Sequence, residues 1–303
     1  MTTSSAKSIL IVGGSGYLGT TLAYRLRDKY RVYSTYRSHP FQMERVISVR
    51  MSLGDSDQIR RVVHLARPDI ILFCAGRGGL PDQLDSDELR ALEATQTGGT
   101  ATLLNIAQIY QPRFVYFSVS SVFDGLKGNY REGDTLIAAD DIGKIKAATE
   151  NIVRGKSFSW NIVRTSEVIG IGHGLRPTLL DKIRWSLSQG KRVELTYHQL
   201  HSYAVGPSFA EFIEKLVEIG PRNQILHFGG ATKVTEYELG AAIAKKFGLD
   251  ASLISIKSLG HSKKGSSLDL SLNCSAMVES LKIKPLLLEE SLDLIQKHLI
   301  PAF

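Results

Sequence analysis

The stretch "SILIVGGSGYLG" (residues 8–19) joins a short apolar run to a glycine-rich turn, and this junction decides the fold. The apolar run predicts a buried strand over residues 8–14. Leu18, Leu22 and Leu26 then recur at the spacing of one helical face, which predicts a helix that begins at the turn. A strand, a glycine turn and a helix in this order are the context of a dinucleotide-binding loop.

Three glycines give the turn a GxxGxxG spacing: Gly13, Gly16 and Gly19. Gly13 permits a tight turn, Gly16 lets the backbone approach a pyrophosphate, and Gly19 lets the helix pack closely on the sheet. The helix N-terminus offers backbone N–H groups and a partial positive charge to the phosphates. The loop therefore predicts binding of NAD(P)(H). The alternative is a packing loop on an α/β fold that has lost its ligand.

Apolar strands alternate with helical patterns through the first half of the chain. Further strands are predicted at 31–37, 69–76, 113–121 and 160–166, and further helices at 55–66, 85–110 and 140–154. Strands that are apolar throughout and separated by helices imply a parallel sheet covered on both faces. We therefore predict an α/β fold, a Rossmann-like doubly wound parallel sheet with a smaller C-terminal substrate-binding lobe.

The second half mixes helices and strands less regularly, which predicts a discontinuous division into two lobes. Residues 1–165 are expected to form the NAD(P)-binding Rossmann domain, and residues 200–230 to return to it. Residues 166–199 and 231–303 are expected to form the smaller lobe, laid over the carboxyl ends of the sheet, where ligands of doubly wound sheets bind.

The composition describes an ordinary soluble globular protein of 303 residues, with 43% hydrophobic and 22% charged residues. Cys74 and Cys274 lie far apart and form no CxxC motif, so we expect a reducing cytoplasm and no metal site. His198 and His201 form an HxxH pair without a third ligand. No apolar run is long enough to span a bilayer, and we expect no membrane partner.

The net charge of +7 arises from lysines and arginines spread along the chain. The densest basic patch is "HSKKGSS" at 261–267, which is short and has no interleaved aromatic residue. We interpret it as a solvated loop and expect no nucleic-acid partner.

The end of the second predicted strand indicates which cofactor binds. Arg37 and Ser38 stand where an acidic residue would accept hydrogen bonds from the ribose of NAD. A guanidinium suits a 2′-phosphate, so NADP(H) is favoured over NAD(H). The alternative is a surface arginine that touches no ligand.

Several segments recur in order along nearly the whole chain and resemble the dTDP-4-dehydrorhamnose reductase branch of the extended short-chain dehydrogenase/reductase family. They are "SVSSVFDG" (118–125), "GNYREGD" (128–134), "GKIKAATE" (143–150), "VRTSEVIG" (163–170) and "HQLHSYAVGPSFA" (198–210). The resemblance implies a nicotinamide site and a nucleotide-sugar pocket between the lobes. The same branch includes an NADP-binding regulatory subunit of methionine adenosyltransferase.

Members of this family reduce a keto group with a Ser/Thr, a Tyr and a Lys. Carried over by position, Lys146 matches the lysine, which also holds the nicotinamide ribose. Ile142 falls at the tyrosine, Val119 falls at the Ser/Thr, and Gln96 falls near a helper asparagine. The usual proton donor and its hydroxyl neighbour are therefore both apolar.

The expected site contains these matched positions and the polar groups around them. Its cofactor-binding set is Gly13, Gly16, Tyr17, Leu18, Gly19, Arg37, Ser38, Ser52, Leu53, Cys74, Ala75, Gly76 and Lys146. The catalytic set is Lys146, Ser120 and Ser118, with Asp140 and Asp141 near the gap left by the tyrosine. Because general acid catalysis contributes roughly 10²–10⁴-fold, we expect slow reduction by the usual route.

Two functions from different classes fit this pattern. One is a reductase or epimerase that acts on a carbonyl compound similar to a nucleotide sugar through a non-standard active site. The other is a catalytically inactive nicotinamide-nucleotide-binding protein that regulates a partner. A small-molecule substrate is expected in the first case, and a homodimer or a protein partner is compatible with either.

Overall fold

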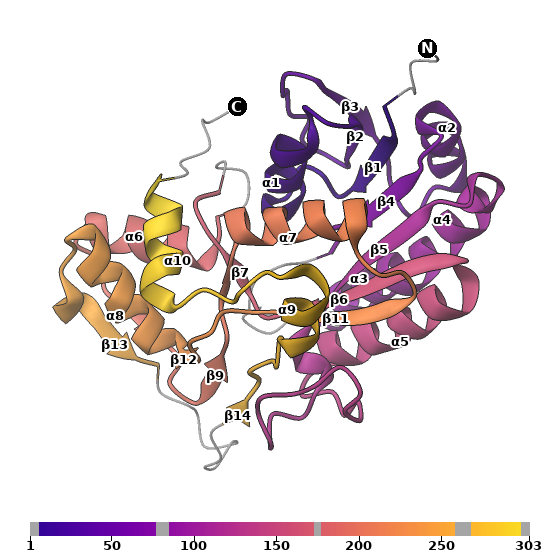
Figure 1. The fold of residues 1–303 in the computed structure, drawn as a ribbon. Coiled ribbons are helices and arrows are strands. Elements are labelled where there is room, and N and C mark those ends of the chain that lie inside the picture. The colour runs from indigo at the N-terminus through magenta and orange to yellow at the C-terminus, as the bar shows by residue number, and fades with distance from the viewer. Residues whose placement is uncertain (1–5, 77–84, 173–176, 258–267, 298–303) are drawn as a thin grey trace.

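A computed structural model describes residues 6–76, 85–172, 177–257 and 268–297. Its centre is a seven-stranded sheet, with a second group of helices at one side of the molecule (Figure 1). The basic patch at 261–267 lies outside the described residues. Within the described ranges, no helix combines the length and apolar character needed to cross a membrane.

The seven strands of the central sheet are all parallel and follow the order β11-β6-β5-β4-β1-β2-β3. Their bounds are β1 Ser8–Val12, β2 Arg31–Tyr36, β3 Val46–Arg50, β4 Ile70–Phe73, β5 Arg113–Val119, β6 Ser159–Thr165 and β11 Gln224–Phe228. The strand order reverses direction between β1 and β4, and such a switch point opens a crevice at the carboxyl ends of the strands. The predicted doubly wound sheet is confirmed.

Helices cover both faces of the sheet, as strands that are apolar on both sides require. On one face, α1 (Tyr17–Leu26) and α7 (Gly206–Ile219) pack on β1, β5 and β6 in one core cluster. On the other face, α2 (Ser56–Ala66), α4 (Thr100–Ala107) and α5 (Asp141–Lys156) form a second cluster with the opposite sides of the same strands.

The remaining elements form a third core cluster beside the sheet. Its helices gather at one end of the molecule, away from β3 (Figure 1). They are α6 Leu179–Ser188, α8 Glu236–Phe247 and α10 Leu288–Lys297, and α9 Ser275–Leu281 packs nearby against β11. Short strands connect them: β7 Val168–Ile169, β8 Val193–Leu195, β9 Gln199–His201, β10 Ala204–Val205, β12 Val234–Thr235, β13 Ile254–Ile256 and β14 Leu268–Asp269.

Two elements of the first half of the chain differ from the sequence-based expectation. The single helix predicted over 85–110 is divided into α3 (Ser86–Glu93), a π-helical segment η1 (Ala94–Gly99) and α4, and a 3₁₀ turn at Gln108–Tyr110 follows. Hydrophobic periodicity misses such a change because one wider turn shifts the apolar face by a single residue. Strand β3 was not predicted, because it is a short edge strand whose side chains are only partly buried.

Candidate functional site

The glycine loop closes tightly on the end of β4. Gly13 has φ +81°, and a Cβ atom there would lie 2.7 Å from the Cα atom of Ala75. Its backbone N–H donates a hydrogen bond to Oγ1 of Thr35 at 3.0 Å. A Cβ atom at Gly19 would lie 2.5 Å from the Cα atom of Gly14. The protein itself therefore needs glycine at these positions, because backbone atoms occupy the space of a side chain.

Gly16 is different, because the protein leaves room for a side chain there. A Cβ atom would meet only the carbonyl oxygen of Gly13, at 3.5 Å. Gly16 is the N-cap of α1 and makes no side-chain capping hydrogen bond, so the first N–H groups of α1 are free to bind an anion. A pyrophosphate needs both space and N–H donors, and this point of the loop offers both. The residues present therefore fit a dinucleotide.

The loop contains one constrained glycine that the spacing argument missed. A Cβ atom at Gly14 would lie 1.7 Å from Oγ of Ser34 in β2. The doubled glycine in "GGSG" was the available signal, since a second glycine beside a turn indicates another close approach.

Tyr17 and Leu18 turn their side chains into the protein. The Tyr17 hydroxyl donates a hydrogen bond to the carbonyl oxygen of Ile169 at 3.2 Å. It lies so close to Gly170 and Gly206 that a Cβ atom on either would overlap it. Leu18 packs against the core on the α1 face. Tyr17 therefore joins the glycine loop to β7, and only the backbone of these two residues faces a phosphate site.

The loops after β2 and β3 lie side by side at the carboxyl edge of the sheet. Tyr36 and Arg50 are partners in register, and the exposed Arg37 and Ser38 follow directly. The N–H of Ser52 donates a hydrogen bond to Oε1 of Gln58 at 3.0 Å. This places the predicted selectivity residues at the same edge as the glycine loop.

The loops after β3 and β4 complete this edge. In the loop after β3, Leu53 lies against Gly99, where an added Cβ atom would come within 2.8 Å of the leucine side chain. Cys74 is partly buried, and burial raises the pKa of its thiol well above the ordinary range. Ala75 accepts a hydrogen bond from Nε2 of Gln96 at 2.7 Å.

Lys146 sits in a buried hydrogen-bond network beside this loop. Its Nζ atom donates to Oε1 of Gln96 and to the carbonyl oxygen of Phe117, both at 3.0 Å. The Tyr116 hydroxyl donates to the same Gln96 oxygen at 2.8 Å, and Nζ lies 4.9 Å from the Tyr116 ring centroid. A Cβ atom at Gly76 would lie 3.6 Å from Nζ. The cation is thus held at the cofactor edge of the sheet.

Burial lowers the pKa of Lys146 to about 8. Desolvation of the ammonium is the main cause, and the nearby Cys74 and Glu150 side chains oppose it. Gln96 holds the lysine from the π-helical segment, and π-helical turns are frequent at functional sites. The resemblance had pointed to Gln96, but Tyr116 was missed because it reads as an ordinary strand residue.

Val119 and Ile142, which the resemblance aligned with the usual donors, both have apolar side chains. Val119 ends β5 and packs against the core on the α1 face. Ile142 lies in the first turn of α5, one turn before Lys146, and is partly buried. Neither side chain can give up a proton or donate a hydrogen bond.

The polar alternatives near this gap are buried or engaged elsewhere. The Ser118 hydroxyl is buried and has no hydrogen-bond partner, and Ser120 is also buried. Asp140 caps α5 by accepting from the N–H of Gly143 at 2.6 Å and also accepts from the Ser121 hydroxyl. Asp141 is exposed and pairs with Lys144. Asp140 therefore stabilises the start of α5, and Asp141 forms an ion pair on the surface.

The motifs shared with the reductase branch have a structural task in this chain. The ring of Tyr130 stacks on Phe123 with centroids 4.3 Å apart, and its hydroxyl donates to Asp124. Oε1 of Glu132 accepts from the backbone N–H of His227 in β11 at 3.0 Å. These contacts attach the loop after β5 to β11 of the same sheet.

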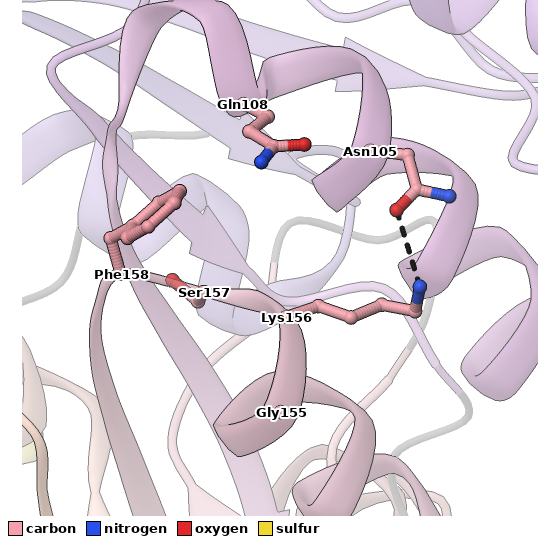
Figure 2. A pocket seen from close by; sticks show the side chains of 6 residues that line it. All are labelled: Asn105, Gln108, Gly155, Lys156, Ser157 and Phe158. Carbon is pink, nitrogen blue, oxygen red and sulfur yellow. Dashed lines mark hydrogen bonds between the residues drawn. The ribbon is translucent and has the colours of Figure 1, made fainter.

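Figure 2 shows a hollow away from this site, at the ends of α4 and α5. It is lined by Asn105, Gln108, Gly155, Lys156, Ser157 and Phe158. Nζ of Lys156 donates to Oδ1 of Asn105 at 3.3 Å. The hollow adjoins the amino end of β6, so it lies at the edge of the parallel sheet opposite the glycine loop. Across the described ranges, no group of three His, Cys, Asp or Glu side chains is arranged to hold a metal ion.

The sheet, the glycine loop and the placed lysine define an extended short-chain dehydrogenase/reductase. The family model for the RmlD substrate binding domain matches residues 7–284, and the chain belongs to that family. The resemblance seen in the sequence is thereby confirmed.

Known proteins similar to this chain include a reductase, a protein of polysaccharide biosynthesis and a subunit of methionine adenosyltransferase. Methionine adenosyltransferase 2 subunit beta of Rattus norvegicus is 24% identical over 82% of this chain and 74% of its own length. Spore coat polysaccharide biosynthesis protein SpsK of Bacillus subtilis is 26% identical over 91% of this chain and 92% of its own length. The structure of dTDP-4-dehydrorhamnose reductase from Bacillus anthracis in complex with NADP superimposes with a TM-score of 0.77, at 18% identity, over 97% of this chain and 99% of that one.

Proposed function

We propose that this protein is an NADP(H)-dependent reductase or epimerase that acts on a carbonyl compound similar to a nucleotide sugar, with a non-standard active site. The observation that carries the proposal is the position of Lys146 Nζ beside Gly76, at the same edge as the open glycine loop. A lysine ammonium buried against a dinucleotide cradle can hold the nicotinamide ribose. When bound, the cofactor supplies the hydride.

The preference for NADP(H) over NAD(H) rests on Arg37. It is exposed and stands at the loop after β2 without a neighbouring acidic residue in sequence, and a guanidinium suits a 2′-phosphate. A structural neighbour, the Bacillus anthracis reductase, binds NADP, which supports the same preference.

Two lobes divide the tasks in this proposal. Residues 1–165 together with 200–230 hold the cofactor, and residues 166–199 and 231–303 shape the substrate site. The position of β11 at the edge of the central sheet and the packing of α7 on α1 support this division. Sugar nucleotides suit a crevice between two such lobes.

The non-catalytic alternative is less favoured, because the glycine-loop edge is intact and because a polysaccharide biosynthesis protein and a dTDP-4-dehydrorhamnose reductase match 91% and 97% of the chain. The deciding experiment measures NADPH oxidation by absorbance with a panel of 4-keto sugar nucleotides. We expect turnover with at least one member. Tight binding of NADPH without oxidation by any member of the panel would support the regulatory alternative instead.

A further inference from the structure

Glu167 lies on a segment that connects the reacting region to the glycine loop. Thr165, two residues before it, is the register partner of Val119 across β5 and β6. Ile169, two residues after it, accepts the hydrogen bond from the Tyr17 hydroxyl. Glu167 therefore lies at the carboxyl edge of the sheet. It stands between Val119, which occupies the expected Ser/Thr position, and the start of α1.

Polar groups around Glu167 lack partners inside the protein. The residues Tyr203 and Ser166 are 3% and 2% exposed, and neither hydroxyl makes a hydrogen bond. In the part of the chain that the structure describes, no hydrogen bond reaches the carboxyl group of Glu167 either. Nearly all buried polar groups in proteins are hydrogen-bonded. The Tyr203 hydroxyl and the Glu167 carboxyl group interact electrostatically, so these two unpartnered groups indicate a place where a polar ligand binds.

The groups that interact electrostatically with Glu167 lie in α6, in α8 and just before β10. Glu236 opens α8, and its Oε2 atom is occupied by the N–H and the hydroxyl of Thr196, both at 2.8 Å. Lys182 in α6 and Tyr203, which precedes β10, also interact electrostatically with Glu167. Burial is the main cause that raises the pKa of Glu167 to about 7; the Glu236 carboxylate adds to the increase and Lys182 opposes it.

We propose that Glu167 is the acid of this site, and that its carboxyl group donates to the carbonyl oxygen of the substrate the proton that Ile142 and Val119 cannot supply. The inference rests on the proposed reductase function. The hydride forms a new C–H bond at the carbonyl carbon, and the π electron pair of the C=O bond moves to oxygen. The carboxyl O–H bond of Glu167 breaks, the proton joins that oxygen, and the resulting carboxylate takes a new proton from water.

The first test compares Glu167→Gln with wild type in NADPH oxidation with 4-keto sugar nucleotides. Glutamine keeps the shape of the side chain and can donate a hydrogen bond, but it cannot release a proton. We expect the rate to fall by about 100-fold or more, with little change in KM. The matched control is Glu194→Gln, an exposed carboxylate of β8, which should keep the wild-type rate.

The pH profile separates an acid from a structural residue. The acid must be protonated to act, so the wild-type rate should be constant below pH 7 and fall above it, and this fall should be absent in Glu167→Gln. Ile142→Tyr with Val119→Thr, added to Glu167→Gln, should restore the rate by providing the usual donors. An unchanged rate and profile in Glu167→Gln would overturn the role of Glu167 and leave the reductase function standing.

Infrared spectroscopy tests whether the Glu167 carboxyl group is protonated, and it does not require turnover. The difference spectrum between wild type and Glu167→Gln should contain the C=O band of a protonated carboxyl group, which disappears as the pH rises through 7. A carboxylate already ionised at pH 5 would overturn the inference. If wild type binds NADPH but no keto sugar nucleotide supports its oxidation, the proposed reductase function is wrong. The catalytic role of Glu167 is then wrong as well.

Discussion

Gly16 is the glycine of the GxxGxxG turn at which the fold itself leaves room for a side chain. The nearest protein atom to an added Cβ would be the Gly13 carbonyl oxygen at 3.5 Å. The other glycines of the loop press on backbone or on Ser34. This difference makes Gly16 the position at which binding can be tested separately from folding.

We expect Gly16→Val to weaken NADPH binding by at least roughly 100-fold, or about 2.8 kcal/mol, because the side chain occupies the path of the pyrophosphate. Fluorescence titration measures the affinity, and circular dichroism checks the fold. Gly133→Val is the matched control, since a Cβ atom there meets no protein atom within 4 Å. Near wild-type affinity in Gly16→Val would show that the loop is not the phosphate site.

Arg37 supplies a second test at a single residue. Arg37→Ala should weaken NADPH binding by about tenfold or more and leave NADH binding unchanged, because a charge-assisted hydrogen bond to the 2′-phosphate contributes about 1.5–3 kcal/mol. Arg60→Ala, an exposed arginine of α2, is the control. Equal affinities of wild type for NADPH and NADH would remove the selectivity role of Arg37.

At the scale of elements, the π-helical segment η1 and strand β5 meet through Gln96. Gln96 is completely buried and connects Lys146, Tyr116 and the Ala75 carbonyl. Its segment departs from the α-helical pattern at the point where the side chain must reach the sheet. Gln96 therefore lies in the π-helical turn and also holds Lys146 in the site.

Gln96→Leu should lower the free energy of unfolding by about 1–3 kcal/mol, because the Tyr116 hydroxyl and the Lys146 ammonium lose their shared acceptor. NADPH binding should weaken as well, since Lys146 is no longer held in place. Urea denaturation and NADPH titration measure the two effects. Gln108→Leu, at an exposed position on the adjoining 3₁₀ turn, is expected to change neither.

The contact between β6 and α5 includes a buried ion pair. Arg164 and Glu150 are each 2% exposed in their side chains, and Nη2 of Arg164 lies 2.7 Å from Oε2 of Glu150. Arg164→Met should cost about 3–5 kcal/mol of stability, because it leaves a buried carboxylate unpaired. Lys144→Met, which breaks the exposed pair with Asp141 on the same helix, should change stability far less, because water screens exposed ion pairs. Equal midpoints in urea for the two variants would contradict this difference.

At the scale of the whole molecule, two buried histidines connect stability to pH. Burial is the main cause that lowers the pKa of His201 to about 4 and that of His227 to about 3. Unfolded histidine has a pKa near 6.5, so below that pH the unfolded chain binds protons that the folded chain does not. Both residues therefore destabilise the fold progressively as the pH falls from about 6.5 towards 4.

The free energy of unfolding should fall on acidification with a contribution of up to about 1.4 kcal/mol per pH unit from each histidine. Urea denaturation between pH 7 and pH 4 measures this slope. His201→Gln should make the slope shallower, whereas His64→Gln, at an exposed position in α2, should leave it unchanged. An identical slope in His201→Gln would mean that His201 is already protonated in the folded protein.

The sequence alone determined those features that depend on neighbours along the chain. The apolar run before the glycines predicted β1 and α1, and the alternation that follows predicted the doubly wound sheet, because burial on both faces requires strands that are apolar throughout. The resemblance in motif spacing also aligned Val119 and Ile142 with the usual donors, and this alignment stays a prediction.

Only the tertiary structure decided what surrounds those positions. Gln96 reaches Lys146 across 50 residues of sequence, and a π-helical turn that no periodicity shows makes this contact. Glu167 resembled any variable residue between two motif positions until its neighbours Tyr203 and Glu236 were placed. The pKa of a carboxyl group depends on burial and on charges brought near it by the fold, and strand register and lobe packing set both.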